Sequence, residues 1–293
     1  PGDIQGLAPG KTRYTILTNE QGGILDDLMV TDRGDHLYLV VNAACKNADF
    51  AYIRNRLAER ARLEILDDRA LLALQGPAAA TVMGRLHAEA PDMEFMTAAA
   101  LNLDAIPCLV TRSGYTGEDG YEISVAAPDA EKLARRLLAE SEVLPAGLGA
   151  RDSLRLEAGL CLYGHDIDKT TTPVEASLSW VLGKRRREEG GFPGARIILD
   201  QLKTGAAKKR VGLKPDGKSL ARDHTAVEND AGEVIGEVTS GGYGPSVEGP
   251  IAMGYMKTEY ASPETPVNLR VRGKALPGSV VKLPFVDQRY YKS

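Results

Sequence analysis

Cysteine and aromatic residues are scarce in this 293-residue sequence, and both shortages exclude classes of protein. The three cysteines, Cys45, Cys108 and Cys161, lie far apart and form no CxxC pair. Such a set argues against a disulfide scaffold and is typical of a reducing compartment. The four histidines lack the spacing of zinc ligands, so no metal site is predicted. Aromatic residues make up only 5% and the net charge is −4, which gives no reason to expect a nucleic-acid partner.

Long apolar runs and targeting signals are also missing. The best apolar run, residues 37–41, is far shorter than the roughly 20 residues of a membrane span, so no membrane partner is expected. No signal or transit segment is recognisable. Because the chain opens at Pro1, shortly before the first predicted strand, it is expected to be a fragment without its N-terminal part. Signatures of a P-loop, an HExxH zinc site or a G-x-S-x-G elbow are absent.

The hydrophobic pattern predicts a mixture of helices and hairpin-connected strands. Alternating or buried-type strands are expected at residues 13–18, 24–30, 36–42, 70–75, 108–112 and 121–125. Helical spacing is found from residue 47 onward and over residues 78–87, 129–141 and 150–159. The pattern favours an α+β fold with antiparallel sheets packed by helices.

The composition changes after a basic run at residues 184–187. Short strands with glycine-rich turns follow, at residues 210–213, 233–239, 251–256, 267–272 and 279–283. This spacing predicts a small β-barrel. We therefore divide the chain into an α+β region, residues 1–190, and a C-terminal barrel domain, residues 191–293, with residues 188–193 as the candidate linker.

Few residues suggest chemistry by pattern alone. Asp26 and Asp27 interrupt an apolar strand, and alternation places Asp26 on the face of Ile24 and Leu28. Asp26 is either an exposed acid at a strand edge or a buried carboxylate that needs a partner or a task. Glu122 faces away from its apolar neighbours in a strand, and Arg151 opens a helix. From the local pattern alone, an ordinary surface position is the default interpretation for both.

Three longer motifs allow a more specific interpretation of the sequence. They are Thr18-Asn19-Glu20-Gln21-Gly22-Gly23-Ile24-Leu25-Asp26-Asp27, Arg112-Ser113-Gly114-Tyr115-Thr116-Gly117-Glu118-Asp119-Gly120-Tyr121-Glu122, and the block from Ala146 through Arg151 to Leu160 that runs on to Tyr163-Gly164-His165-Asp166. In this order they resemble the aminomethyltransferases, the T-proteins of the glycine cleavage system, over essentially the whole chain. The mitochondrial branch looks closest, because residues 183–187 and Tyr290-Tyr291 are similar to it.

This resemblance implies a three-domain cloverleaf with a folate site. It implies transfer of the methylene group from an aminomethyl-lipoyl carrier, the H-protein, to tetrahydrofolate in glycine catabolism and one-carbon metabolism. The products are 5,10-methylenetetrahydrofolate and ammonia. The other glycine cleavage components are expected partners, and the mitochondrial matrix is the expected location.

The resemblance also assigns roles to single residues. Asp26 matches the key catalytic acid of the family. Glu122 would accept hydrogen bonds from the pterin edge, and Arg151 would offer a guanidinium to the folate. The remaining folate-lining candidates are Tyr115, Tyr290, Tyr14 and Asn42. The basic run at residues 184–187 is predicted to contribute to carrier docking.

Some features depart from the family. Its N-terminal segment, which adds cavity-lining residues, is absent here, and Gly244 stands where serine is more usual. Two relatives of the same fold are alternatives: a folate-linked demethylating or dehydrogenase-associated domain, and a non-catalytic folate-binding protein of the iron–sulfur assembly type. The latter carries a Lys-Gly-Cys-Tyr motif where this chain has Leu160-Cys161-Leu162-Tyr163, and this chain retains Asp26. Those differences favour the transferase.

Overall fold

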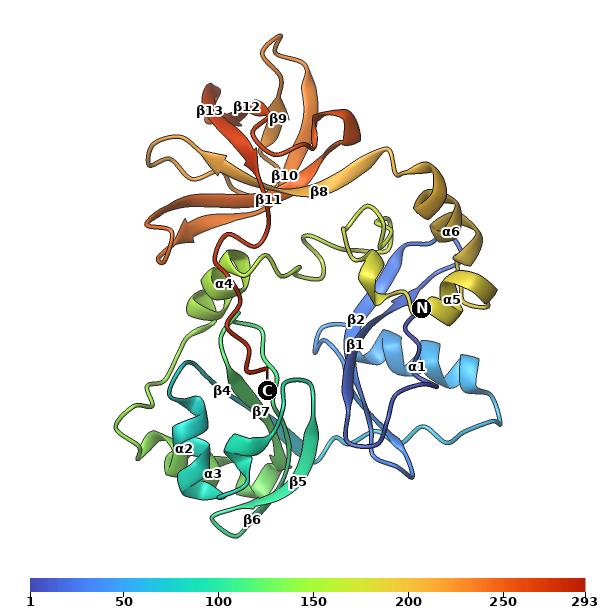
Figure 1. Ribbon diagram of the computed structural model, residues 1–293, viewed down its shortest axis with the longest axis vertical. Helices are drawn as coiled ribbons and strands as arrows, with labels where there is room; N and C mark the ends of the chain where they lie inside the picture. The colour runs from blue at the N-terminus through green and yellow to red at the C-terminus, as the bar shows by residue number, and fades with distance from the viewer. Residues whose placement is uncertain (293) are drawn as a thin grey trace. The chain divides into compact units, whose positions relative to one another are not determined.

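The structure is a computed structural model that describes residues 1–292 (Figure 1). Its contacts divide the chain into two compact units, and each is built from separated segments. Unit 1 comprises Pro1–Asp3, Thr15–Asp27 and Leu148–Gln288, and unit 2 comprises Ile4–Tyr14, Leu28–Gly147 and Arg289–Ser293.

The strands are β1 Thr12–Thr18, β2 Ile24–Asp32, β3 Leu37–Val40, β4 Arg69–Gln75, β5 Ala98–Leu103, β6 Ile106–Thr111, β7 Gly120–Ala126, β8 Lys208–Pro215, β9 Ala226–Glu228, β10 Val234–Gly244, β11 Gly249–Lys257, β12 Pro266–Val271 and β13 Lys274–Val281. The helices are α1 Lys46–Leu57, α2 Ala79–Leu86, α3 Ala130–Leu138, α4 Leu148–Glu157, α5 Lys184–Glu189 and α6 Ala195–Thr204. Four short 3-10 turns complete the regular structure: Ala90–Asp92, Ala127–Asp129, Ser179–Val181 and Thr258–Tyr260.

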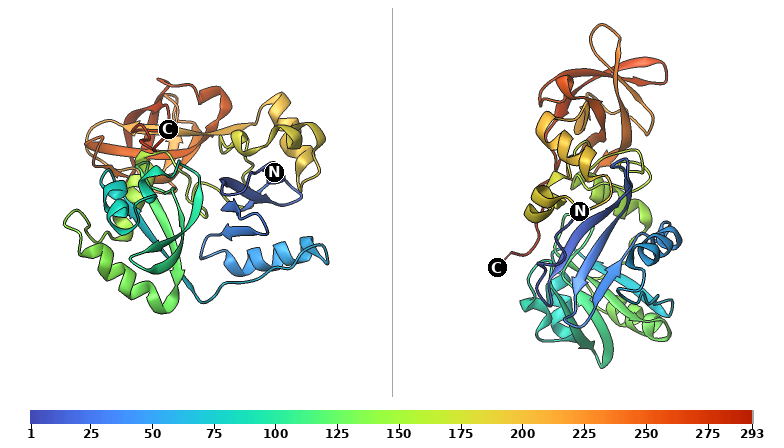
Figure 2. Two further views of the ribbon diagram at one scale, coloured as in Figure 1. Left: turned by 60° about the horizontal axis from the view of Figure 1, so that its bottom comes forward. Right: turned by 90° about the vertical axis from the view of Figure 1, so that its right-hand side faces the viewer.

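Unit 2 is centred on a four-stranded antiparallel sheet in the order β4-β7-β6-β5. Helices α2 and α3 cover one face of it (Figures 1 and 2). Helix α2 buries Ala79, Val82, Met83 and Leu86, the i, i+3, i+4, i+7 spacing of a helix with one apolar face. Its partner in the sheet includes Tyr121, which is fully buried and donates its hydroxyl to the Ala90 carbonyl at 3.1 Å. Full burial of such side chains, about 1.5–3 kcal/mol each, stabilises this core.

Unit 1 contains a closed six-stranded barrel in the order β10-β11-β8-β13-β12-β9, drawn in orange and red in Figure 1. Closure leaves no free sheet edge among these strands. Val227, Val238 and Leu269 are fully buried at its centre. Helix α4 packs against β10 and β11 through Leu156, which contacts Ile251 and Met253.

A third sheet, in the order β1-β2-β3, belongs to neither unit alone. Strand β1 passes from unit 2 into unit 1 between Tyr14 and Thr15, and β2 returns between Asp27 and Leu28. These two strands therefore contribute residues to both cores.

The predicted α+β class with antiparallel sheets and a C-terminal barrel is confirmed. The glycine-rich segment at residues 112–119 connects β6 to β7, which are antiparallel neighbours. The predicted linker at residues 188–193 is wrong in kind: it is the end of α5 and the turn into α6, a helix that the sequence pattern did not reveal. The sequence pattern did not predict strand β5 either.

The division of the chain into an α+β region, residues 1–190, and a barrel domain, residues 191–293, stays a prediction.

Candidate active site

Asp26 is the best-defined candidate, and a tight turn fixes its place in unit 1. Side chains of β2 alternate between buried and half-buried, so Asp26 is 0% exposed while Asp27 on the other face is half-buried. The exposed edge position that the pattern left open is thereby excluded. Removing a carboxylate from water in this way is costly unless it is paired or hydrogen-bonded.

The turn before β2 explains why Asp26 reaches this position. Asn19 accepts hydrogen bonds from the amides of Gln21 and Gly23, both at 2.9 Å, and its amide nitrogen donates to the Lys169 carbonyl at 2.9 Å. Gly22 has a φ of +83°, and a Cβ on Gly23 would lie 1.8 Å from that carbonyl oxygen. The Asn-x-x-Gly-Gly sequence is therefore required for the start of β2 to lie against residues 168–171.

Arg151 lies in the first half of α4 and is exposed. The next turn of the helix is buried instead: Arg155, 3% exposed, donates to Asp166 at 2.7 Å and to Ser240 at 2.9 Å. Glu157 accepts from the Ser246 amide at 2.6 Å. These buried contacts anchor the C-terminal half of α4 to the barrel, so that Arg151 projects from a fixed helix.

Glu122 is half-buried in β7, where it pairs with Ala73 of β4 and Thr111 of β6. Its neighbours Tyr121 and Ile123 point toward α2 and α3, so Glu122 lies on the opposite face of the sheet. The Ser113 hydroxyl donates to its Oε2 at 3.3 Å. The sheet thus presents a half-buried carboxylate, the type of group that can accept hydrogen bonds from a forked donor.

Tyr115 and Tyr290 also belong to unit 2. Tyr115 is half-buried in the loop between β6 and β7. Tyr290 stacks on Phe95 with ring centroids 4.2 Å apart, and its burial raises the pKa of the phenol. Phe95 is not among the residues predicted for the site. Tyr14 in β1 and Asn42 after β3 are half-buried, and the Asn42 carbonyl accepts the Cys45 amide at 2.9 Å.

The residues thus fall into two groups that the structure defines separately. Asp26 and Arg151 belong to unit 1, and Glu122, Tyr115, Tyr290, Tyr14 and Asn42 belong to unit 2. Among residues 1–292, no group of three or more histidine, cysteine, aspartate or glutamate side chains could hold a metal ion. The same described range holds no helix of the length and apolarity that crossing a membrane requires.

The basic run is largely engaged within unit 1. Arg185 pairs with Asp3 at 2.8 Å, Arg186 donates to the Gly191 carbonyl at 3.2 Å, and Arg187 donates to the Ser179 carbonyl at 2.6 Å. Lys184 is the most exposed member, with 91% of its side chain accessible. The arginines therefore have a structural task that the sequence did not suggest.

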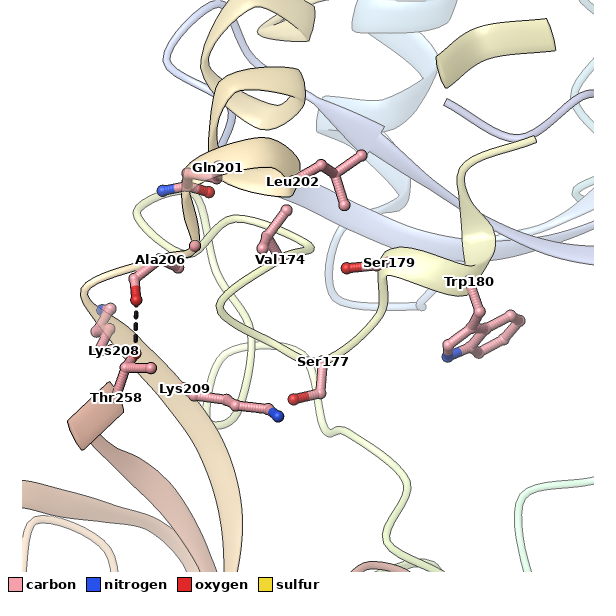
Figure 3. Close-up of a pocket in the computed structure, with 11 residues that line it drawn as sticks. Val174, Ser177, Ser179, Trp180, Gln201, Leu202, Ala206, Lys208, Lys209 and Thr258 are labelled. Atoms are coloured by element: carbon pink, nitrogen blue, oxygen red, sulfur yellow. Dashed lines mark hydrogen bonds between the residues drawn. The ribbon is translucent and has the colours of Figure 1, made fainter. Parts of the chain in front are cut away.

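A separate pocket of about 530 Å³ lies in unit 1 between the end of α6 and the start of β8 (Figure 3). Lys209 and Ser177 point toward one another across it, and Thr258 donates to the Ala206 carbonyl at 2.5 Å. None of the seven predicted site residues is among its lining residues.

Comparison with known proteins matches the chain to two family models. Residues 1–186 match the GCVT N-terminal domain model, and residues 208–287 match the glycine cleavage T-protein C-terminal barrel domain model. The mitochondrial aminomethyltransferase of Mesembryanthemum crystallinum is 50% identical over 302 residues, covering 100% of this chain and 74% of the relative. That of Gallus gallus is 51% identical, covering 99% and 76%.

A solved structure is similar as well. The crystal structure of the glycine cleavage system aminomethyltransferase T from Bartonella henselae superimposes with a TM-score of 0.91 at 44% identity, covering 98% of this chain and 79% of that one. The family models together span most of the chain, and the relatives match it almost end to end. The chain therefore belongs to the glycine cleavage T-protein, or aminomethyltransferase, family.

Proposed function

We propose that this protein transfers the methylene group of an aminomethyl-lipoyl H-protein to tetrahydrofolate, releasing ammonia and forming 5,10-methylenetetrahydrofolate. Family membership supports the reaction class. The observation that carries the proposal for this chain is Asp26, a carboxylate with 0% exposure in a strand that the Asn19 turn holds in place. Burial of a carboxylate is costly, and Asp26 stands at the position that resembles the key acid of the family.

Asp26 is the proposed catalytic acid. Tetrahydrofolate, when bound, supplies the two nitrogens that take up the carbon. A carboxylate oxygen of Asp26 placed beside them would orient the attacking nitrogen and hold a proton during the transfer. Electrostatic interactions of a group buried in this way are less screened by solvent than those of a surface group.

The other residues are proposed to bind folate. Glu122 would accept the adjacent N–H donors of the pterin as a fork, with Ser113 holding one of its oxygens. Arg151 would offer its guanidinium to a carboxylate of the folate. The four remaining candidates, Tyr115, Tyr290, Tyr14 and Asn42, would line the site. The half-buried carboxylate and the stacked Phe95–Tyr290 pair fit a planar ring with polar edges.

Partners and location follow the family. The proposed carrier is the lipoylated H-protein, together with the other components of glycine cleavage. The relatives are named mitochondrial, which supports the mitochondrial matrix as the location of this protein. The basic run at residues 184–187 is proposed to contribute to carrier docking, chiefly through exposed Lys184.

The test compares Asp26→Asn with Asp27→Asn. We expect Asp26→Asn to lower the rate of methylenetetrahydrofolate formation by about 10²-fold or more, the usual effect of losing a proton-transfer group. Asp27→Asn, the neighbouring acid on the other face, is the matched control and should retain the rate. Product is measured from aminomethyl-loaded H-protein and tetrahydrofolate, and thermal unfolding verifies that both variants are folded.

Each outcome has a clear meaning. Equal rates for the two variants would remove Asp26 from the mechanism. A folded wild-type protein that binds tetrahydrofolate without forming product would instead be a non-catalytic folate-binding protein.

A further inference from the structure

The last residues of the described chain lie along the loop that carries Tyr115. The Arg289 amide donates to the Gly117 carbonyl at 2.7 Å, and Arg289 also forms an ion pair with Glu118. The Phe95 amide donates to the Tyr291 carbonyl at 3.3 Å. These contacts all lie within unit 2, where the dark red tail ends near β7 (Figure 1). Residues 289–291 therefore cover the loop of residues 112–119.

Arg112 lies beneath both segments. Its side chain is only 2% exposed. It donates from Nε and Nη2 to the two carboxylate oxygens of Asp119, at 2.9 and 2.6 Å. Its Nη1 donates to the carbonyls of Pro91 and Met93, at 2.7 and 2.6 Å. This fork closes the base of the loop, because Arg112 and Asp119 stand at its two ends.

The same guanidinium also holds the tail. Its central carbon lies 3.9 Å from the centroid of the Tyr291 ring, a close cation–π contact. Burial alone would lower the pKa of Arg112, but the hydrogen-bonded ion pair with Asp119 reverses this and raises it. The guanidinium is therefore charged at any pH at which the protein is folded, and its cation–π attraction to the Tyr291 ring does not depend on pH in that range.

We propose that Arg112 is a positioning residue for folate binding. It joins the loop that carries Tyr115 to the tail that carries Tyr290, and it sets both aromatic side chains through the Asp119 fork and the Tyr291 ring. The Arg289–Gly117 hydrogen bond and the Arg289–Glu118 ion pair also join the two segments, and Arg112 adds the buried contact between them. A lysine keeps the charge but cannot form the planar fork. This inference rests on the proposed folate roles of Tyr115 and Tyr290.

The test uses Tyr291→Leu, Tyr291→Phe and Arg112→Lys. Leucine removes the aromatic face, whereas phenylalanine retains it. We expect Tyr291→Leu and Arg112→Lys to weaken tetrahydrofolate binding by about tenfold, the scale of one desolvated cation–π or charge-assisted contact. Tyr291→Phe should bind like wild type. The KM for the H-protein carrier should stay unchanged in all three.

Two further readouts separate positioning from loss of folding. Hydrogen exchange should accelerate at residues 113–119 and 289–292 in Tyr291→Leu and Arg112→Lys, and should be unchanged in β4 and β7. The double variant should lose less affinity than the product of the two single losses, because both changes act on contacts of the same guanidinium. Arg85→Lys, a change of another paired arginine in unit 2, is the control and should leave folate binding intact.

The proposal is wrong if folded Tyr291→Leu binds tetrahydrofolate as tightly as wild type and keeps wild-type exchange in the loop. That variant decides the matter should Arg112→Lys not fold, since Tyr291 is 42% exposed and lies outside the core. Failure of the wild-type protein itself to bind tetrahydrofolate would overturn the proposed function, and the positioning role with it.

Discussion

Residues of the same type differ in this protein chiefly by their environment. Asp26 and Asp27 are adjacent acids, yet one is completely buried and the other faces partly into solvent. The three cysteines differ in the same way. Cys161 and Cys108 are buried, whereas Cys45 is half-buried at the start of α1.

This difference predicts the order in which the thiols react. Burial raises the pKa of Cys161 to about 12, so the reactive thiolate is essentially absent at neutral pH. Burial also raises the pKa of Cys108. We expect a thiol reagent at pH 8 to modify Cys45 in the native protein and to reach Cys108 and Cys161 only after unfolding. Labelling followed by mass spectrometry measures this order.

Rapid native-state labelling of Cys161 would contradict that expectation. It would also revive a role for this thiol of the kind found in the cysteine-motif relatives of the fold. An inert Cys161 agrees with a mechanism that depends on the Asp26 carboxylate.

For single residues, the sequence predicted the face of the strand on which a side chain lies better than it predicted whether that side chain is buried. Period-two alternation correctly separated Asp26 from Asp27 and Glu122 from Tyr121. It could not predict that Asp26 is buried, because the Asn19 turn packs on Lys169, 150 residues further along the chain. The contact between Arg112 and Tyr291 could not be predicted for the same reason. The two residues are far apart in the sequence and meet only in the folded protein.

The helices and strands of unit 2 are tied together by surface ion pairs as well as by the core. Arg85 of α2 donates to Glu140 at 2.5 Å and to Glu142 at 2.6 Å, just beyond α3. The hydrogen bond from Arg85 is the main reason why the pKa of Glu142 falls from 4.5 to about 2. The two helices are therefore joined by a pair that titrates in acid.

The lowered pKa has a defined sign for stability. Glu142 binds its proton more weakly in the folded protein than in the unfolded chain, so its contribution is complete above pH 4.5 and is lost as the pH falls toward 2. We expect Glu142→Gln to lose less stability than wild type between pH 5 and pH 2.5, by a small amount because the pair is exposed to solvent. Thermal unfolding across this pH range measures the difference, and parallel curves would contradict the prediction.

Helices and strands whose apolar residues recur with a clear period were predicted well. Elements without such a period were not. Helix α2 and strand β7 have strong periods, and the structure places them within one or two residues of the predicted bounds. Helix α6 was missed because its sequence follows Gly190-Gly191 and Pro193, which indicate a linker. Its fully buried residue, Ile198, packs near Gly22 of the turn before β2, a contact between distant segments.

The whole molecule is built from interleaved segments. The chain crosses between the two units after Asp3, Tyr14, Asp27, Gly147 and Gln288. The segment around the fourth crossing is open to solvent, with Leu144 81% and Leu148 84% exposed. After a single cut there, each unit would still be built from segments of both fragments.

Limited proteolysis tests this arrangement. A protease that cuts before leucine should cleave first at Leu148, because exposed and weakly packed segments are cut most readily. We expect fragments 1–147 and 148–293 to elute together under native conditions, since residues 15–27 of the first belong to the core of unit 1. In urea the same fragments should separate. Separate elution without denaturant would show that the shared strands contribute little.

The interleaving also has a consequence for synthesis on the ribosome. Residues 15–27 emerge early but belong to a core whose remaining segments, from Leu148 to Gln288, are translated much later. Unit 2 in turn receives Arg289 and the residues after it at the end of the sequence. Neither unit can therefore finish folding as a nascent chain before nearly all of this sequence has been translated. Residues 15–27 therefore lack their later packing partners in unit 1 for most of translation, which is the period when chaperones would bind such a segment.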